Sequence, residues 1–136
     1  ALSLVGSEMC IRDSTNTKPT EDSIKSMLFG WQVLKHVKSN AIITVKDNTT
    51  VGIGAGQVSR IDAVDIAISK SKAAIKGSIL CSDAFFPFRD SIDKISQYNI
   101  NGVIQPGGSI KDNEVIDACN EHNIPMVFTG RRCFKH

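Results

Sequence analysis

The feature that most constrains the fold is an alternation of helical and strand patterns along the chain. Apolar residues recur at helical spacing over 21–38 and again after residue 59, and short runs rich in β-branched residues lie between such segments. This alternation is typical of a sheet with helices on both faces, so it predicts a three-layer α/β unit. We expect strands at 41–46, 51–53, 79–81, 102–105 and 125–129. We expect four helices: one at 21–38, one from 59 or 60 to near 77, a short one that begins at 90, and one that ends at about 119.

The length and charge of the chain exclude several classes of protein. Its 136 residues suffice for one domain, and no apolar run is long enough for a transmembrane helix. The 16 basic and 14 acidic residues leave a net charge of +2, and the basic residues form no stripe, which argues against nucleic-acid binding. The four cysteines lack metal-ligand spacing, and the motifs of zinc deaminases are absent. We expect free thiols in a cytoplasmic protein.

Residues 1–14 look foreign to the rest of the chain. They resemble translated sequencing adapter and do not begin with Met. A secretory signal would need a basic start and an unbroken apolar stretch, whereas Glu8, Arg12 and Asp13 interrupt this one. We therefore expect the native domain to occupy residues 15–136, and we expect residues 1–14 to contribute nothing to folding or ligand binding.

The run SDAFFPFRD at residues 82–90 is the most distinctive local feature. It places three of the six phenylalanines around a proline, between two aspartates and beside an arginine. One interpretation is a buried strand end followed by the start of a helix, and the chemistry alone favours it because aromatic clusters are usually core. The other interpretation is a pocket wall for a flat, polar, heteroaromatic ligand.

The glycine-rich segment GIGAG at 52–56 also allows two interpretations. Its third glycine comes one residue too early for a dinucleotide fingerprint, and no G-K-[ST] follows for a P-loop. The segment is either a bend where two backbones approach closely, or a bend that delivers Arg60 to a ligand at a helix N-terminus. Arg60 opposes the helix dipole at that position, which hints at function, although a solvated charge is the simpler explanation.

Five motifs occur in a fixed order: VKSNAI at 37–42, GIGAGQVSR at 52–60, SDAFFPFRD at 82–90, VIQPGGSI at 103–110 and RCFKH at 132–136. Together they resemble the C-terminal part of the bifunctional purine-biosynthesis family that joins AICAR formyltransferase to IMP cyclohydrolase. The ordered set, which covers residues 17–136, is far more specific than any single motif. The resemblance implies a cytidine-deaminase-like α/β subdomain without zinc. It also implies a cytoplasmic family whose full-length members form homodimers.

The resemblance assigns ligand-binding roles to individual residues. It implies that AICAR is bound by Asn40, Arg60, Phe85, Pro87, Asp90, Arg132 and Phe134. It implies that the co-substrate 10-formyltetrahydrofolate contacts Ile61, Phe88 and Asp90. It further suggests a monovalent cation, K⁺, near Ser39 and Asp83.

No catalytic residue is expected within this chain. The catalytic Lys-His pair of the family stands in a K-H-V-N-P context, whereas Lys35 and His36 precede VKSN. The implied function is that of a fragment of phosphoribosylaminoimidazolecarboxamide formyltransferase, which transfers a formyl group to AICAR in IMP synthesis and is joined to IMP cyclohydrolase in the full-length protein. We expect the fragment alone to be inactive. The alternative is a stand-alone nucleotide-binding or interaction module with a deaminase-like fold and no catalysis.

Overall fold

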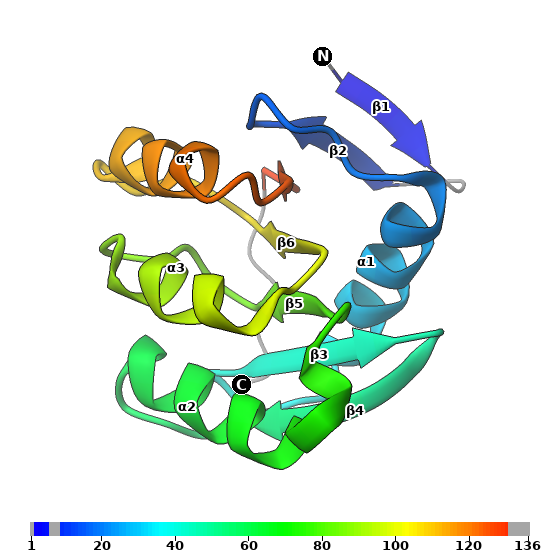
Figure 1. Cartoon of the computed structure of the whole chain (residues 1–136), viewed down its shortest axis with the longest axis vertical. Helices are drawn as coiled ribbons and strands as arrows, with labels where there is room; N and C mark the ends of the chain where they lie inside the picture. Colours follow the sequence, from blue (N-terminus) through cyan, green and yellow to red (C-terminus); the bar gives the residue numbers. More distant parts are fainter. Residues whose placement is uncertain (1, 6–8, 131–136) are drawn as a thin grey trace.

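The computed structural model describes residues 2–5 and 9–130, with the side chains from residue 11 onward. A seven-stranded sheet lies between helix α1 on one face and helices α2, α3 and α4 on the other (Figure 1), which confirms the predicted three-layer α/β unit. The strands are β1 (Leu2–Val5), β2 (Met9–Asp13), β3 (Ile42–Lys46), β4 (Thr49–Gly54), β5 (Ile79–Ser82), β6 (Gly102–Gln105) and β7 (Met126–Phe128). The helices are α1 (Glu21–Leu34), α2 (Arg60–Ser71), α3 (Asp90–Ile95) and α4 (Asp112–Glu121), with short 3-10 helices η1 (Lys72–Ile75) and η2 (Ser96–Tyr98).

The sheet is mixed, with strand order β1-β2-β7-β6-β5-β3-β4. Strands β5, β6 and β7 are parallel to one another, and the other neighbouring pairs are antiparallel. Strands β3 and β4 form a hairpin that closes through Asp47 and Asn48, whose φ angles of 52° and 56° suit the two central residues of a type I′ turn. Because this turn has only two residues, β4 begins at Thr49, earlier than the sequence predicted.

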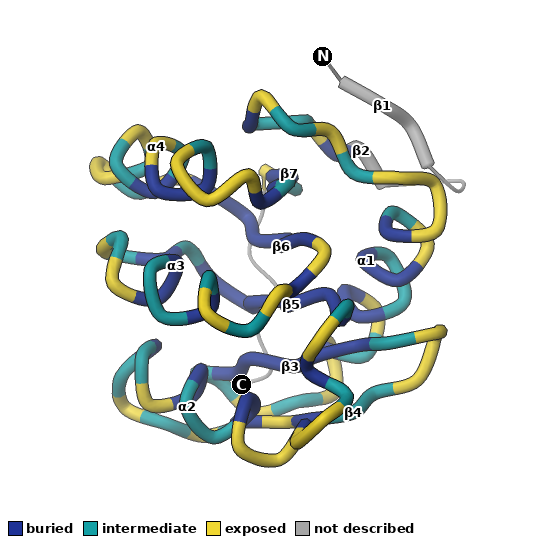
Figure 2. The backbone as a smooth tube through the Cα atoms, in the orientation of Figure 1, coloured by how far each residue is buried: buried dark blue, intermediate teal, exposed yellow. Residues whose placement is uncertain are grey.

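Two hydrophobic cores lie on opposite faces of the sheet. Successive side chains of a strand point to opposite faces, so Ile42 packs in the core beneath α2, α3 and α4, while Ile43 packs beneath α1. The central strands β3, β5 and β6 are almost entirely buried (Figure 2). Among the described residues, every helix is too short or too polar to cross a lipid bilayer.

The starts of α1 and α2 follow the local sequence, whereas their ends differ from expectation. The side chains of Thr20 and Ser59 accept hydrogen bonds from the backbone N–H groups of Ser23 and Asp62, as N-cap residues do. Helix α1 ends at Leu34 rather than near residue 38, and α2 gives way to η1 after Ser71. The early end of α1 leaves the segment around residues 38–41 non-helical, and that segment later forms part of the site.

Strand β2 overturns the expectation that residues 1–14 contribute nothing to the fold. It pairs antiparallel with β7, with Arg12 opposite Phe128 and Asp13 opposite Val127. Ile11 is 1% exposed and packs in the core beneath α1. A strand near the end of a sheet, with one face buried and the other facing solvent, needs only alternate apolar residues, so the charged neighbours of Ile11 did not prevent pairing. The adapter-like origin of the segment stays a prediction.

Replacing Ile11 with alanine is therefore expected to lower the free energy of unfolding by about 2–5 kcal/mol, because it removes buried methyl groups and leaves a cavity. Urea-induced unfolding of the whole chain measures this loss. Asn16→Ala is the matched control, since that side chain is exposed. Equal stability of Ile11→Ala and the parent chain would restore the original expectation for residues 1–14.

Candidate nucleotide pocket

A pocket of about 270 Å³ opens where strands β4 and β5 end and strand β3 begins. These strand ends lie together because Ile42 lies opposite Gly54 on one side and Ser82 on the other. The loops after β4 and β5 therefore meet the segment before β3. The pocket is lined by Asn40, Val58, Ser59, Arg60, Ala84, Phe85 and Pro87.

Arg60 is held in a buried ion pair at the pocket. Its side chain is 7% exposed, and its Nη1 donates to Asp83 Oδ1 at 2.5 Å and to the carbonyl oxygen of Ala41 at 3.1 Å. Its Nη2 donates to Asn40 Oδ1 at 3.0 Å. The simpler explanation of Arg60 as a solvated charge is therefore wrong.

Asp83 balances the charge of Arg60 from within the protein. Its side chain is completely buried at the end of β5. The Ser39 hydroxyl donates to Asp83 Oδ2 at 2.6 Å, so both carboxylate oxygens have protein partners. The two oxygens invoked for a monovalent cation are thus hydrogen-bonded to each other, beside an arginine that already neutralises the carboxylate. The monovalent cation stays a prediction, and we assign no chemical step to it.

Asn40 connects the segment before β3 to the loop after β4. Its side-chain amide donates to the carbonyl oxygen of Val58 at 2.9 Å. Its backbone N–H and carbonyl both pair with Gln57 at 3.3 Å, and the Ser39–Asn40 peptide bond is cis. These bonds fix Asn40 and Arg60 relative to one another.

Both interpretations of the glycine segment apply, at different residues. A Cβ on Gly54 would collide with the backbone of Ala63, so β4 and α2 approach too closely for any other residue there. The chain then turns through residues 55–59 into α2, whose first residue is Arg60. The bend is thus a close approach of two backbones, and it also brings Arg60 to the pocket.

The aromatic run likewise divides between core and pocket. Phe86 is fully buried among the side chains beneath α2, α3 and α4. Phe85 and Pro87 are half-buried and line the pocket, whereas Phe88 is 56% exposed. A single stretch of sequence therefore supplies a core anchor and a pocket wall.

The structure brings some of the predicted site residues together and leaves others apart. Asn40, Arg60, Phe85 and Pro87 share the pocket. Ile61, Phe88 and Asp90 do not line it, and the Asp90 carboxylate instead accepts a hydrogen bond from the Ser91 N–H at 2.8 Å. Arg132 and Phe134 lie outside the described residues. Sequence reasoning missed Val58, Ser59 and Ala84, which line the pocket beside residues that it had identified.

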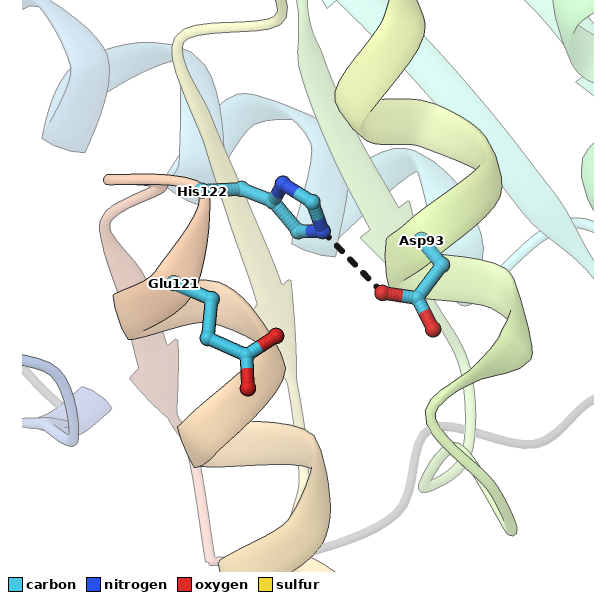
Figure 3. Close-up of side chains that lie close together, drawn as sticks. All are labelled: Asp93, Glu121 and His122. Carbon is cyan, nitrogen blue, oxygen red and sulfur yellow. Dashed lines mark hydrogen bonds and ion pairs between the residues drawn. The ribbon is translucent and has the colours of Figure 1, made fainter.

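A second polar cluster lies on the exposed surface between α3 and α4 (Figure 3). One ligand atom from each of Asp93, Glu121 and His122 falls within 4.8 Å of the others, a spacing that a metal ion can use. Arg89, however, donates to Asp93 at 2.9 and 3.0 Å and also to Glu121. Since the guanidinium already pairs with both carboxylates, we assign no metal here. Asp93 and His122 are 29 positions apart, so their spacing carried no signal in the sequence.

The hydrogen bonds from Arg89 hold the pKa of Asp93 at about 2, and they lower the pKa of Glu121 below its ordinary value. A lowered pKa means that the folded state favours the charged carboxylate. The stabilisation from Asp93 is therefore fully present above its ordinary pKa of 3.8 and is lost as the pH falls through about 2. The cluster acts as an exposed electrostatic link between two helices.

Cys81 and Cys119 are buried free thiols, as expected. Burial raises the pKa of both thiols, that of Cys119 to about 12. Neither is therefore a thiolate near neutral pH, and neither is suited to act as a nucleophile. The side chains of Cys10 and Cys133 lie outside the described residues.

Known proteins resemble this chain in sequence and in fold. The model of the AICARFT/IMPCHase bienzyme family matches residues 5–70. The bifunctional purine biosynthesis protein PurH of Persephonella marina is 54% identical over 125 residues, covering 90% of this chain and 24% of that protein. The protein of the same description from Dictyostelium discoideum is 59% identical over 122 residues, covering 90% of this chain and 22% of that protein.

The chain thus spans about a quarter of the length of these relatives. Two crystal forms of Acinetobacter baumannii RibD resemble its fold, with TM-scores of 0.50 and 0.52. They are 11% and 10% identical in sequence, and the matches cover 79% and 76% of this chain and 34% of each RibD chain. At such low identity the likeness concerns the fold alone.

Proposed function

This chain is homologous to one part of the bifunctional purine biosynthesis proteins, and on that premise we propose that it forms part of the nucleotide pocket of an AICAR formyltransferase. The observation that carries the proposal is that Asn40, Arg60, Phe85 and Pro87, which come from three separate motifs, line a single pocket. The proposal includes the finer fold assignment, a cytidine-deaminase-like subdomain without zinc. The lack of zinc-deaminase motifs in the sequence supports the part without zinc.

The chemistry of the pocket suits a flat nucleotide. Phe85 and Pro87 offer apolar surfaces on which an imidazole ring can pack. Arg60 supplies N–H donors held in a fixed orientation, and Ser59 and Arg60 lie at the N-terminus of α2, where the helix dipole favours negative groups. AICAR combines an imidazole carboxamide with a phosphate, so it matches both properties.

The proposed reaction transfers a formyl group from 10-formyltetrahydrofolate to the amine of AICAR. Such a transfer needs a base for the amine proton, stabilisation of a tetrahedral oxyanion, and precise positioning of both substrates. We assign positioning to this chain and proton transfer to none of its described side chains. We propose that Ile61, Phe88 and Asp90 contact the folate co-substrate. In support, Phe88 is an exposed aromatic ring that a flat pterin can cover. A cytoplasmic homodimer is part of the same proposal.

Titration of the chain with AICAR, followed by isothermal calorimetry, tests the nucleotide assignment. We expect saturable binding, and we expect Phe85→Ala to weaken it about fivefold or more, because stacking on an aromatic ring contributes about 1–3 kcal/mol. Phe88→Ala is the matched control, since Phe88 does not line the pocket and its loss should leave AICAR affinity unchanged. We expect no turnover when 10-formyltetrahydrofolate is added. Absence of AICAR binding, or equal binding by Phe85→Ala, would exclude this pocket as the nucleotide site.

A further inference from the structure

The guanidinium of Arg60 is oriented by three acceptors from two segments of the chain. Ala41 and Asn40 provide neutral oxygens from the segment before β3, and Asp83 provides a carboxylate from the end of β5. An arginine side chain carries five N–H donors in a fixed plane. The three acceptors take both hydrogens of Nη1 and one of Nη2. Among the described residues, the Nε hydrogen and the second Nη2 hydrogen have no hydrogen-bond partner.

Asp83 differs from the other two acceptors because it carries a charge and is completely buried. Charge-assisted hydrogen bonds are roughly twice as strong as neutral ones, so Asp83 should dominate the orientation of Arg60. The carboxylate is itself fixed, since Ser39 donates to its second oxygen and its own backbone N–H donates to the Ala41 carbonyl at 3.2 Å. The Asp83 side chain therefore links the end of β5 to Arg60 in the pocket and restrains its guanidinium.

We propose that Asp83 is a positioning residue for the nucleotide. It holds the Arg60 guanidinium in one orientation at the wall of the pocket, so that its remaining N–H groups are available to the ligand. Fixing a long side chain before binding avoids the entropy that a free arginine would lose on contact with a ligand. This inference rests on the proposed nucleotide site, but the orientation of Arg60 can be measured without any ligand.

A purely structural role is the alternative. In that case the ion pair merely fastens the segment around residue 40 to β5, and the orientation of Arg60 has no effect on binding. The two roles differ in what Asp83→Asn should do. The amide is nearly the same shape as the carboxylate but lacks its charge, so the fold can persist while the hold on Arg60 weakens.

The test combines nitrogen-15 NMR of arginine side chains with calorimetric titration of AICAR into the whole chain. In the parent chain we expect separate signals for Nη1 and Nη2 of Arg60, because rotation of the guanidinium is hindered. In Asp83→Asn we expect these signals to average and AICAR affinity to fall about tenfold or more. Asp93→Asn is the matched control. It makes the same chemical change beside Arg89, away from the pocket, and should alter neither the Arg60 signals nor the affinity.

Persistent separate signals in Asp83→Asn, or AICAR affinity equal to that of the parent chain, would overturn the inference. Should Asp83→Asn fail to fold, the parent chain and Arg60→Lys decide, because lysine retains the charge but lacks the planar set of donors. Averaged Arg60 signals in the parent chain, or unweakened AICAR binding by Arg60→Lys, would then refute it. A parent chain that does not bind AICAR refutes the proposed function instead, and the spectra still report whether Asp83 holds Arg60.

Discussion

Replacing Arg60 with alanine is expected to lower the free energy of unfolding by about 3–5 kcal/mol, although arginine substitutions are usually harmless. The reason is that Asp83, the partner of Arg60, would remain buried without a positive charge beside it. Asp83 is completely buried, and without Arg60 its negative charge has only the hydroxyl of Ser39 to stabilise it. The sequence alone suggested a solvated arginine, whose loss costs little stability. The buried ion pair predicts a large effect on stability as well.

Urea-induced unfolding at neutral pH measures this effect, with Arg89→Ala as the control. Arg89 also pairs with carboxylates, but it does so on the surface, where solvent screens the interaction. We expect a much smaller loss from Arg89→Ala. The double variant Arg60→Gln/Asp83→Asn should recover much of the stability lost in Arg60→Ala, because no unpaired charge remains buried. A loss from Arg60→Ala as small as that from Arg89→Ala would show that the ion pair is not buried in solution.

Phe86→Ala is expected to destabilise the chain by about 3–5 kcal/mol, whereas Phe88→Ala should change stability by no more than about 0.5 kcal/mol. The two residues lie two positions apart in one aromatic run, but Phe86 is 0% exposed and Phe88 is 56% exposed. Removing the Phe86 ring leaves a cavity beneath α2, α3 and α4, and removing the Phe88 ring leaves none.

Thermal and urea unfolding of the two variants, measured side by side, separates these roles. The pair is well matched because both changes remove the same atoms from neighbouring positions. Similar losses for the two variants would mean that Phe88 packs against the domain in solution, and the division of the aromatic run between core and surface would be wrong.

The sequence predicted the helices and strands of this fold better than the contacts between distant strands. Hydrophobic period and β-branched composition act over a few residues, so they located the helices and strands β3 to β7. Ile42 and Ile43 pack on opposite sides of the sheet simply because they are neighbours in a strand. Strand β2 escaped prediction because its burial depends on a partner, β7, more than a hundred residues away.

The sequence predicted several residues of the candidate site, but not the ion pair and hydrogen bonds between them. The motifs supplied Asn40, Arg60, Phe85 and Pro87, and the strand order then placed them in one pocket. Nothing in the sequence indicated that Arg60 and Asp83, 23 positions apart, form a buried pair. Such a pair depends on β3 lying beside both β4 and β5, a tertiary arrangement that local patterns do not encode. The roles of Arg132 and Phe134 stay predictions.

The pairing of β2 with β7 also has a consequence for how the chain is made. A ribosome delivers the N-terminus first, and domains generally fold as they emerge. Arg12 lies opposite Phe128, so β2 must wait until more than a hundred further residues have been translated before its partner exists. Throughout that interval β2 offers unpaired backbone groups to any other nascent strand. Slow or interrupted translation between β2 and β7 should therefore favour aggregation that starts from β2.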